Sequence, residues 1–322
     1  MRYFQAGADA VESLSFTPNG ESLVCVDADR EQQLHKHRAV HWLSARTGEQ
    51  QRTLNLREEA WFRSISYAAD CHETGQAYVS PNGLWVAVQR YIGDPVLLDL
   101  WYAKTGEWRE IDLGEHWFVV EGVCFSANSD LMIFACGTDG GGTRELGRLD
   151  LQSEQEVPAI DFPGYSARQL QLTQDGQRLA ALTYGSVFTT RISSWTAGEV
   201  NWTKLDLEIS DSASLRFSPD GKELAIVDGP QLFFWDCESG AVVKRVIEGD
   251  GINDLAYSPD GRLHALGYED GTVILQERET GREVKRYDWK IGRVASVAFA
   301  PDGMTIAAGG DDGRGVRWDV DA

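Results

Sequence analysis

One short turn motif recurs along this chain of 322 residues and constrains its fold more than any other feature. The clearest copies are FSPDG at 217–221, YSPDG at 257–261 and FAPDG at 299–303. Proline presets φ for a type I turn, aspartate suits the next position, and glycine accepts the left-handed conformation that closes a three-residue hairpin. Short apolar runs flank the copies, so each copy predicts the tip of a β-hairpin.

The motif occurs seven times in all. The earlier copies are FTPNG at 16–20, VSPNG at 79–83, FSANSD at 125–130, which has decayed and lost its glycine, and LTQDG at 172–176. The mean spacing is about 47 residues, close to the 40–45 residues of a four-stranded propeller blade. A second glycine turn follows five copies, at 46–48, 104–106, 196–198, 238–240 and 279–281. Each repeat therefore predicts four strands, a to d, with the first motif between a and b and the second between c and d.

Two further segments carry a family resemblance. Together with 217–221, Phe234-Trp235-Asp236 and Val316-Arg317-Trp318-Asp319 resemble the core pattern of the WD-repeat (WD40) family. The resemblance covers essentially the whole chain and is strongest from about residue 211 onward. It implies an all-β fold: a seven-bladed β-propeller with four-stranded antiparallel blades, in one domain over residues 1–322. The repeats lack the Gly-His dipeptide with which the family usually begins a repeat, so its His-centred hydrogen-bond network is expected to be missing or altered.

The last repeat lacks a fourth strand. Residues 294–318 supply strands a to c, and the sequence then stops at Ala322. Residues 2–7 (RYFQAG), which directly precede the first strand a, have the right position to be the missing strand. We expect this N-terminal strand to complete the last blade and close the ring, which removes two exposed sheet edges.

Composition excludes several classes of protein. With 50 acidic and 30 basic residues the net charge is −20, so nonspecific attraction to nucleic acid is not expected. No apolar run reaches the length of a membrane span and the N-terminus lacks a signal-peptide pattern, so we expect a cytoplasmic protein without membrane contact. The five cysteines form no C-x-x-C pair, which is typical of reduced thiols.

Two inserts give the first candidate binding surface. In this topology the d–a and b–c loops share one edge of the blades, here called the top edge, and the a–b and c–d turns share the bottom edge. Surplus residues fall in two top-edge loops, 27–38 and 57–75. The second insert carries Trp61, Phe62 and Tyr67, which are candidate anchors for a partner protein. The alternative is that this insert folds down as an extra strand or helical turn.

Basic residues gather in the same sector. Residues 285–293 carry four bases and one acid. If the ring closes, six cations approach one another over blades seven and one, beside Trp289, His35 and His37: Lys290, Arg293, Arg314, Arg30, Lys36 and Arg38. They predict a docking patch for an acidic or phosphorylated peptide, since arginine forks suit carboxylate and phosphate. The alternative is surface charge paired locally with Asp29, Asp311 and Asp312.

Two function classes follow. The resemblance implies a noncatalytic scaffold that binds a protein or peptide over the top edge of blades seven, one and two. The alternative is a metal-dependent hydrolase or lyase with carboxylates at the channel mouth, since related b–c positions hold Asp27, Asp228, Asp270 and Asp311. Aspartate there usually bonds backbone amides of the turn. His35 and His37 lack a third ligand and no catalytic triad is apparent, so we expect no enzyme, no cofactor and no metal.

Overall fold

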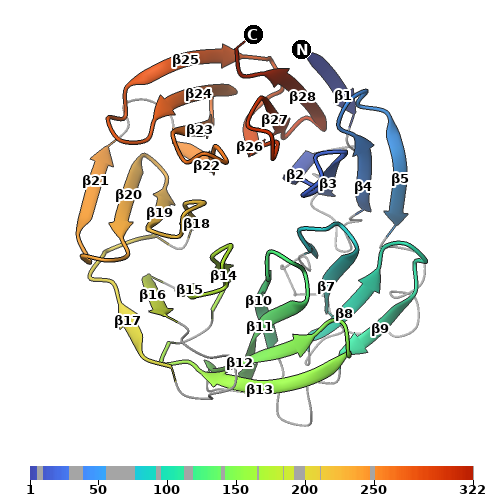
Figure 1. Ribbon diagram of the computed structural model, residues 1–322, viewed down its shortest axis with the longest axis vertical. Coiled ribbons are helices and arrows are strands. Elements are labelled where there is room, and N and C mark those ends of the chain that lie inside the picture. Colours follow the sequence, from blue (N-terminus) through green and yellow to red (C-terminus); the bar gives the residue numbers. More distant parts are fainter. Residues whose placement is uncertain are drawn as a thin grey trace, which may run out of the picture. The chain divides into compact units, whose positions relative to one another are not determined.

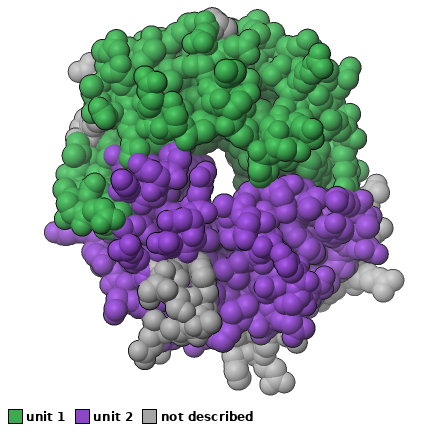
Figure 2. Space-filling view, viewed as in Figure 1, with its two compact units in different colours: residues 1–63, 225–322 green, residues 64–224 purple. Residues whose placement is uncertain are grey.

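The described part of the chain is built from β-strands in seven four-stranded antiparallel sheets (Figure 1). The computed structural model describes residues 1–5, 10–28, 39–55, 77–91, 96–111, 119–138, 142–164, 167–183, 185–191, 200–210, 212–246 and 251–321. Within these ranges, no helical segment has the length and apolar character that crossing a bilayer requires. The chain forms two compact units, residues 1–63 with 225–322 and residues 64–224 (Figure 2).

Three complete sheets belong to the first unit. Blade one contains β2 (Ala10–Phe16), β3 (Ser22–Ala28), β4 (Ala39–Ser44) and β5 (Gln50–Asn55). Blade six contains β22 (Ile252–Tyr257), β23 (Leu263–Tyr268), β24 (Thr272–Glu277) and β25 (Glu283–Asp288). Blade seven contains β26 (Val294–Phe299), β27 (Thr305–Gly310), β28 (Arg314–Asp319) and β1 (Arg2–Gln5).

Three other sheets belong to the second unit. Blade two contains β6 (Ala77–Val79), β7 (Trp85–Tyr91), β8 (Val96–Tyr102) and β9 (Trp108–Ile111). Blade three contains β10 (Val119–Phe125), β11 (Leu131–Thr138), β12 (Gly142–Asp150) and β13 (Gln155–Asp161). Blade four contains β14 (Gln169–Leu172), β15 (Arg178–Thr183), β16 (Ser186–Arg191) and β17 (Trp202–Lys204). Blade five, whose residues are divided between the two units, contains β18 (Ser214–Phe217), β19 (Glu223–Asp228), β20 (Gln231–Asp236) and β21 (Val242–Val246).

The seven sheets are the blades of a β-propeller, as predicted, and consecutive strands pair within each blade, except that β1 pairs with β28 in blade seven. Every copy of the turn motif joins strands a and b of its blade. In blade five, the Ser218 amide donates to the Glu223 carbonyl at 2.8 Å, and the Ser218 hydroxyl donates to Asp220 Oδ1 at 2.6 Å. Gly221 has φ +65°, the left-handed conformation that the motif predicts. That residues 1–322 form one domain stays a prediction.

The blade-three copy of the motif keeps its turn although it lacks glycine. Ser129 occupies the glycine position with φ +61° and donates its amide to the Ser126 carbonyl at 2.8 Å. The Ser126 amide in turn donates to the Leu131 carbonyl at 2.9 Å, as the equivalent residues do in blade five. The sequence motif has decayed, but the hairpin that it encodes has not.

The N-terminal strand completes blade seven, as predicted. β1 pairs antiparallel with β28, with Arg2 opposite Arg317, Tyr3 opposite Val316 and Phe4 opposite Gly315. Phe4 is buried in a cluster that includes Val11, Leu14, Leu23 and Leu43 of blade one. Burial of this aromatic ring joins the closing strand to the first blade, so pairing and packing act together.

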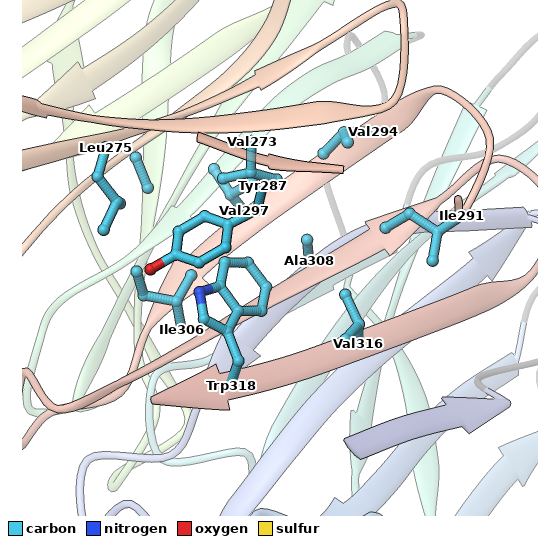
Figure 3. Close-up of a cluster of buried hydrophobic side chains, with 11 residues drawn as sticks. Val273, Leu275, Tyr287, Ile291, Val294, Val297, Ile306, Ala308, Val316 and Trp318 are labelled. Carbon is cyan, nitrogen blue, oxygen red and sulfur yellow. The ribbon is translucent and has the colours of Figure 1, made fainter. Parts of the chain in front are cut away.

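Large apolar side chains fill the space between blades six and seven (Figure 3). Val273, Leu275 and Tyr287 come from blade six, and Ile306 and Trp318 come from blade seven. Trp318 is only 1% exposed. The tryptophan of the Trp318-Asp319 pair is therefore a packing residue, as expected of large residues between the blades of a propeller.

Candidate functional site

The structure describes four of the ten residues predicted to bind a partner. Trp289, Lys290 and Arg293 lie in or beside the loop between β25 and β26, and Arg314 begins β28 after the turn from β27. All four are therefore at the top edge of the first unit. The other six predicted residues lie outside the described part of the chain: Trp61, Phe62, Tyr67, Arg30, Lys36 and Arg38.

Hydrogen bonds fix the loop between β25 and β26. Arg314 Nη2 donates to the Lys290 carbonyl at 2.6 Å, while the Arg293 amide donates to Asp311 Oδ1 at 2.9 Å. Lys290 has φ +55° and the adjacent Ile291 is fully buried. A buried isoleucine and two bonds from the neighbouring turn hold this loop in one conformation, although its charged side chains face solvent.

Each described cation of the predicted patch has a carboxylate partner. Lys290 pairs with Asp288, and Arg314 Nε donates to Asp312 Oδ2 at 2.7 Å. Arg293 lies 3.7 Å from Glu269 and 3.9 Å from Asp311, measured between nitrogen and oxygen. Exposed pairs of this kind contribute little stability, about 0–1 kcal/mol each. The alternative of locally paired charge thus fits the described cations.

The pKa shifts at this edge have the same origin. The hydrogen bond from Lys290 lowers the pKa of the Asp288 carboxyl, and the bond to Asp312 raises the pKa of the Arg314 guanidinium. Both shifts favour the charged forms of the partners. The described top edge of blade seven consequently presents alternating positive and negative groups and has no excess of positive charge.

Trp289 directly follows β25 and packs against the apolar cluster between blades six and seven. Its ring stacks on Tyr287 with centroids 5.3 Å apart, and it lies 5.3 Å from the ring of Trp318. The Tyr3 hydroxyl donates to the Trp289 carbonyl at 3.3 Å, which adds a contact from the closing strand. Trp289 is half-buried, so only part of its ring is open to a partner.

Three of the four aspartates considered for catalysis accept hydrogen bonds from backbone amides beside their turns. Asp270 Oδ1 accepts from the Thr272 amide at 2.9 Å, and Asp311 accepts from the Arg293 amide. Asp27 accepts from the Ala39 amide at 2.5 Å. This is the turn-stabilising role expected from the sequence. No group of three or more histidine, cysteine or acidic side chains in the described ranges is placed to hold a metal ion.

A histidine-centred network is present in an altered form in blade one. The ring of His41 on β4 lies 2.9 Å from Thr53 Oγ1 through Nδ1 and 3.3 Å from Asp27 Oδ2 through Nε2. His41 is 8% exposed, so the network is buried beneath the edge from which residues 29–38 leave the blade. Its polar groups satisfy one another and fix the two strand ends that flank that loop.

Sequence reasoning missed a second group of cations, at the bottom edge. We call Arg2, Arg46 and Arg317 the seam arginines, because they lie where β1 joins blade seven to blade one. Arg2 is opposite Arg317 in the strand pair, and Arg317 Nη2 donates to the Arg46 carbonyl at 2.7 Å. The three residues are far apart in the sequence, and the only signal for their meeting was the predicted closing strand.

Comparison with known proteins matches two segments of the chain to a family of repeats. The family model described as WD domain, G-beta repeat, matches residues 242–275 and 284–319. A serine-threonine kinase receptor-associated protein of Gallus gallus is 26% identical over 223 residues, 68% of this chain and 59% of its own. The Homo sapiens protein of the same name is 25% identical over 225 residues, with the same coverage.

A shorter match extends the comparison. The meiotic recombination protein rec14 of Schizosaccharomyces pombe is 33% identical over 114 residues, which is 34% of this chain and 37% of that protein. The chain spans about three fifths of the length of the receptor-associated relatives it matches.

Proposed function

We propose that this WD-repeat β-propeller is a noncatalytic scaffold that binds a protein or peptide over its top edge at blades seven and one. The chain has four-stranded blades, and two of its segments match the model of the WD repeat. Several relatives are named as proteins associated with a serine-threonine kinase receptor. WD-type propellers bury their repeat residues between blades and leave loops free for contact. We further propose that residues 1–322 form one such domain.

The observation that supports this surface best is the fixed loop between β25 and β26. Its conformation is set by Arg314 and Asp311, while the side chain of Lys290 is 82% exposed. Charged groups on a rigid loop lose little conformational entropy on binding. The alternation of cations and carboxylates there favours selection of a complementary partner and its orientation more than general attraction of acids.

A second part of the proposal concerns the chemistry of the partner. A preference for an acidic or phosphorylated peptide would depend on Arg30, Lys36 and Arg38, since the described cations already have carboxylates beside them. Aromatic anchoring would depend on Trp61, Phe62 and Tyr67. All six lie outside the described residues.

A noncatalytic role and a cytoplasmic location are part of the same proposal. The carboxylates of Asp27, Asp270 and Asp311 are engaged with backbone amides, which supports a structural role for them. Cys25, Cys124 and Cys237 are free thiols, which is typical of proteins from a reducing compartment. Metal analysis of the purified chain checks the enzyme alternative, because stoichiometric calcium or zinc would overturn the noncatalytic proposal.

Affinity capture with the full chain tests the surface. The variant Trp61→Ala/Phe62→Ala/Arg293→Ala removes two proposed anchors and one charged contact. Arg282→Ala is the matched control, because Arg282 is an exposed arginine paired with Glu277 next to the bottom-edge turn of blade six. We expect the triple variant to lose partners that wild type and the control retain. A partner retained at equal strength by the triple variant would show that the proposed surface is wrong.

A further inference from the structure

The seam arginines differ from the top-edge cations in having no carboxylate partner. In the described part of the chain, no acidic group lies within ion-pair distance of Arg2, Arg46 or Arg317. Arg2 and Arg46 are exposed, and Arg317 is half-buried. In a chain with a net charge of −20, Arg2 and Arg317, which have no ion-pair partner among the described residues, form a distinct positive site next to the exposed Arg46.

The geometry brings the side chains of Arg2 and Arg317 together and places the backbone of Arg46 beside them. Arg2 and Arg317 are directly opposed in an antiparallel pair, so their side chains leave the same face of the sheet. On that face Phe4 packs against blade one, and the c–d turn of blade one, residues 45–48, lies next to β1: a Cβ on Gly48 would stand 3.6 Å from Phe4 Cβ. The bond from Arg317 Nη2 to the Arg46 carbonyl places the third arginine at the same seam.

The electrostatic balance at Arg317 is positive. Burial lowers the pKa of the Arg317 guanidinium, and the charge of Arg2 lowers it further, while the nearby Asp319 opposes them with a smaller effect. Arg317 Nε is also buried without a hydrogen-bond acceptor among the described residues. A buried charged donor without an acceptor is costly, which adds to the unfavourable electrostatics of the Arg317 guanidinium.

Like charges directly opposite each other destabilise a strand pair. The closing pair therefore carries an electrostatic penalty at Arg2 and Arg317 that a bound anion would remove. A phosphoryl group carries a charge of about −1.5 to −2 at pH 7 and three acceptor oxygens, which suits several guanidinium groups better than a single carboxylate does.

We propose that the seam arginines bind the phosphoryl group of a phosphorylated side chain in a partner protein. A protein partner is favoured over nucleic acid because the net charge of the chain, −20, opposes binding of a phosphate backbone. Met304 is 70% exposed and lies at the same edge. Its carbonyl accepts a hydrogen bond from the amide of Val320, which directly follows β28. Such a side chain offers an apolar contact to residues beside the phosphate.

The inference rests on the proposed function only in taking a protein as the partner. The seam arginines lie at the bottom edge of the blades, whereas the proposed docking surface lies at the top edge. The two can fail independently. Variants at the top edge leave the seam intact, and variants at the seam leave Arg293 and Arg314 intact.

Peptide binding by the full chain tests the proposal. The probe is a fluorescent library of phosphoserine peptides with randomised flanks, compared with the same library unphosphorylated and with glutamate in place of phosphoserine. We expect selective binding of the phosphorylated library. Loss of one charged hydrogen bond predicts that Arg46→Glu weakens this binding by about tenfold or more. The control Arg282→Ala removes an exposed arginine that lies outside both proposed surfaces and is paired with Glu277, and it should bind as wild type does.

Arg2→Glu separates binding from folding. The variant puts a carboxylate opposite Arg317, so the closing pair gains an attraction where it had a repulsion. We expect its Tm to rise while its binding of the phosphorylated library falls by about tenfold or more. A cluster with only a structural role would show the stability change without any loss of peptide binding, because no phosphate would be bound there.

Several results would overturn the proposal. Equal binding of the phosphorylated and unphosphorylated libraries would exclude the phosphoryl group as the ligand. Equal binding of the phosphorylated and glutamate libraries would show that the site recognises carboxylates. Unchanged peptide affinity in both Arg46→Glu and Arg2→Glu would place the binding elsewhere. Inorganic phosphate that binds as tightly as the peptides would exclude a peptide partner. Binding of a mixed-sequence RNA that is lost in the same variants would assign the site to nucleic acid.

Discussion

Phe4 lies directly opposite Gly315 across the β1–β28 pair, and its ring occupies the space where a side chain on residue 315 would stand. A Cβ on Gly315 would come 2.1 Å from Phe4 Cζ. Phe4 itself is 6% exposed. The closing strand is thus held by an aromatic ring that covers a glycine, an arrangement that also fixes the register of the pair.

Phe4→Ala should destabilise the protein by about 3–5 kcal/mol, since a large buried ring is lost and a cavity remains. Gly315→Ala should cost about 1–3 kcal/mol because its methyl group overlaps the ring. The double variant should lose less than the sum, because the overlap disappears with the ring. Urea unfolding of the four proteins measures this cycle. Strict additivity would contradict the contact.

Ala300→Ser should stabilise blade seven. At this position the other six turns have a serine or threonine, and in blade six the Ser258 hydroxyl donates to Asp260 at 2.7 Å and accepts from the Leu263 amide at 2.9 Å. A hydroxyl at 300 would reach Asp302 and the Thr305 amide in the same way. We expect a gain of about 0.5–1.5 kcal/mol in the free energy of unfolding. Ala300→Gly is the control, and it should not stabilise.

Acid should weaken the hairpin turns. Hydrogen bonds from Ser258 and Thr173 are the main causes that lower the pKa values of Asp260 and Asp175. A lowered folded-state pKa contributes stability above the unfolded pKa, about 3.9, and that stability is lost as pH falls through the folded value. The variant Ser258→Ala/Thr173→Val should therefore differ from wild type more at neutral pH than in strong acid.

Unfolding by urea at a series of pH values measures that difference. Thr203→Val is a suitable control, because Thr203 is an exposed residue of β17. Its effect should be small and independent of pH. A destabilisation of the double variant that stays constant from neutral pH to strong acid would show that the two hydroxyls do not act through the aspartates.

Ser129 should be more sensitive to alanine than to glycine. Its side chain is 2% exposed, and Ser129 Oγ accepts from the Asn82 amide at 3.1 Å across blades two and three. Ser129→Ala loses that acceptor and keeps an unfavourable φ, at a cost of about 1–3 kcal/mol. Ser129→Gly loses the acceptor but relieves the backbone, so it should be more stable than the alanine variant by about 1 kcal/mol. Thermal unfolding ranks the two, and the reverse order would contradict this account.

Asp254 should be essential to the joint between blades six and seven. Its Oδ2 accepts from the Ser296 hydroxyl and the Val297 amide, both at 3.0 Å, and Ser296 Oγ accepts from the Leu14 amide of blade one at 3.1 Å. Asp254→Ala leaves buried donors unpaired, at about 1–3 kcal/mol each. Asp254→Asn keeps an oxygen acceptor and should cost less. Hydrogen exchange at the Val297 amide should quicken in the alanine variant, and unchanged protection there would argue against the joint.

The fold was predictable because its information is local and repeated. Each hairpin turn is encoded within about five residues, and seven copies at a blade-like spacing determine the blade count. The closing strand followed from counting strands in the last repeat. Ser129 shows the limit of a motif, since a residue other than glycine takes the same φ where a buried hydrogen bond supports it.

The candidate surfaces were less predictable because the partner of a charged residue can come from a turn that is distant in the sequence. Residues 285–293 do contain a surplus of bases. The carboxylates that face Arg293, however, belong to Glu269 and Asp311, which come from other turns. The meeting of Arg2 and Arg317 needed the register of the pair as well as its existence. A shift of one residue would have put Arg2 on the other face of the sheet.

The pairing of β1 with β28 has a consequence for biosynthesis. Of the described strands, β1 leaves the ribosome first and its partner leaves last. While the nascent chain grows, blades can form one after another, but β1 has no partner and its edge stays open to other chains. The final closure joins the two most distant of the described strands and must overcome the largest loop entropy, so the emergence of β28, rather than the assembly of any single blade, is the step at which the propeller becomes committed to its native form.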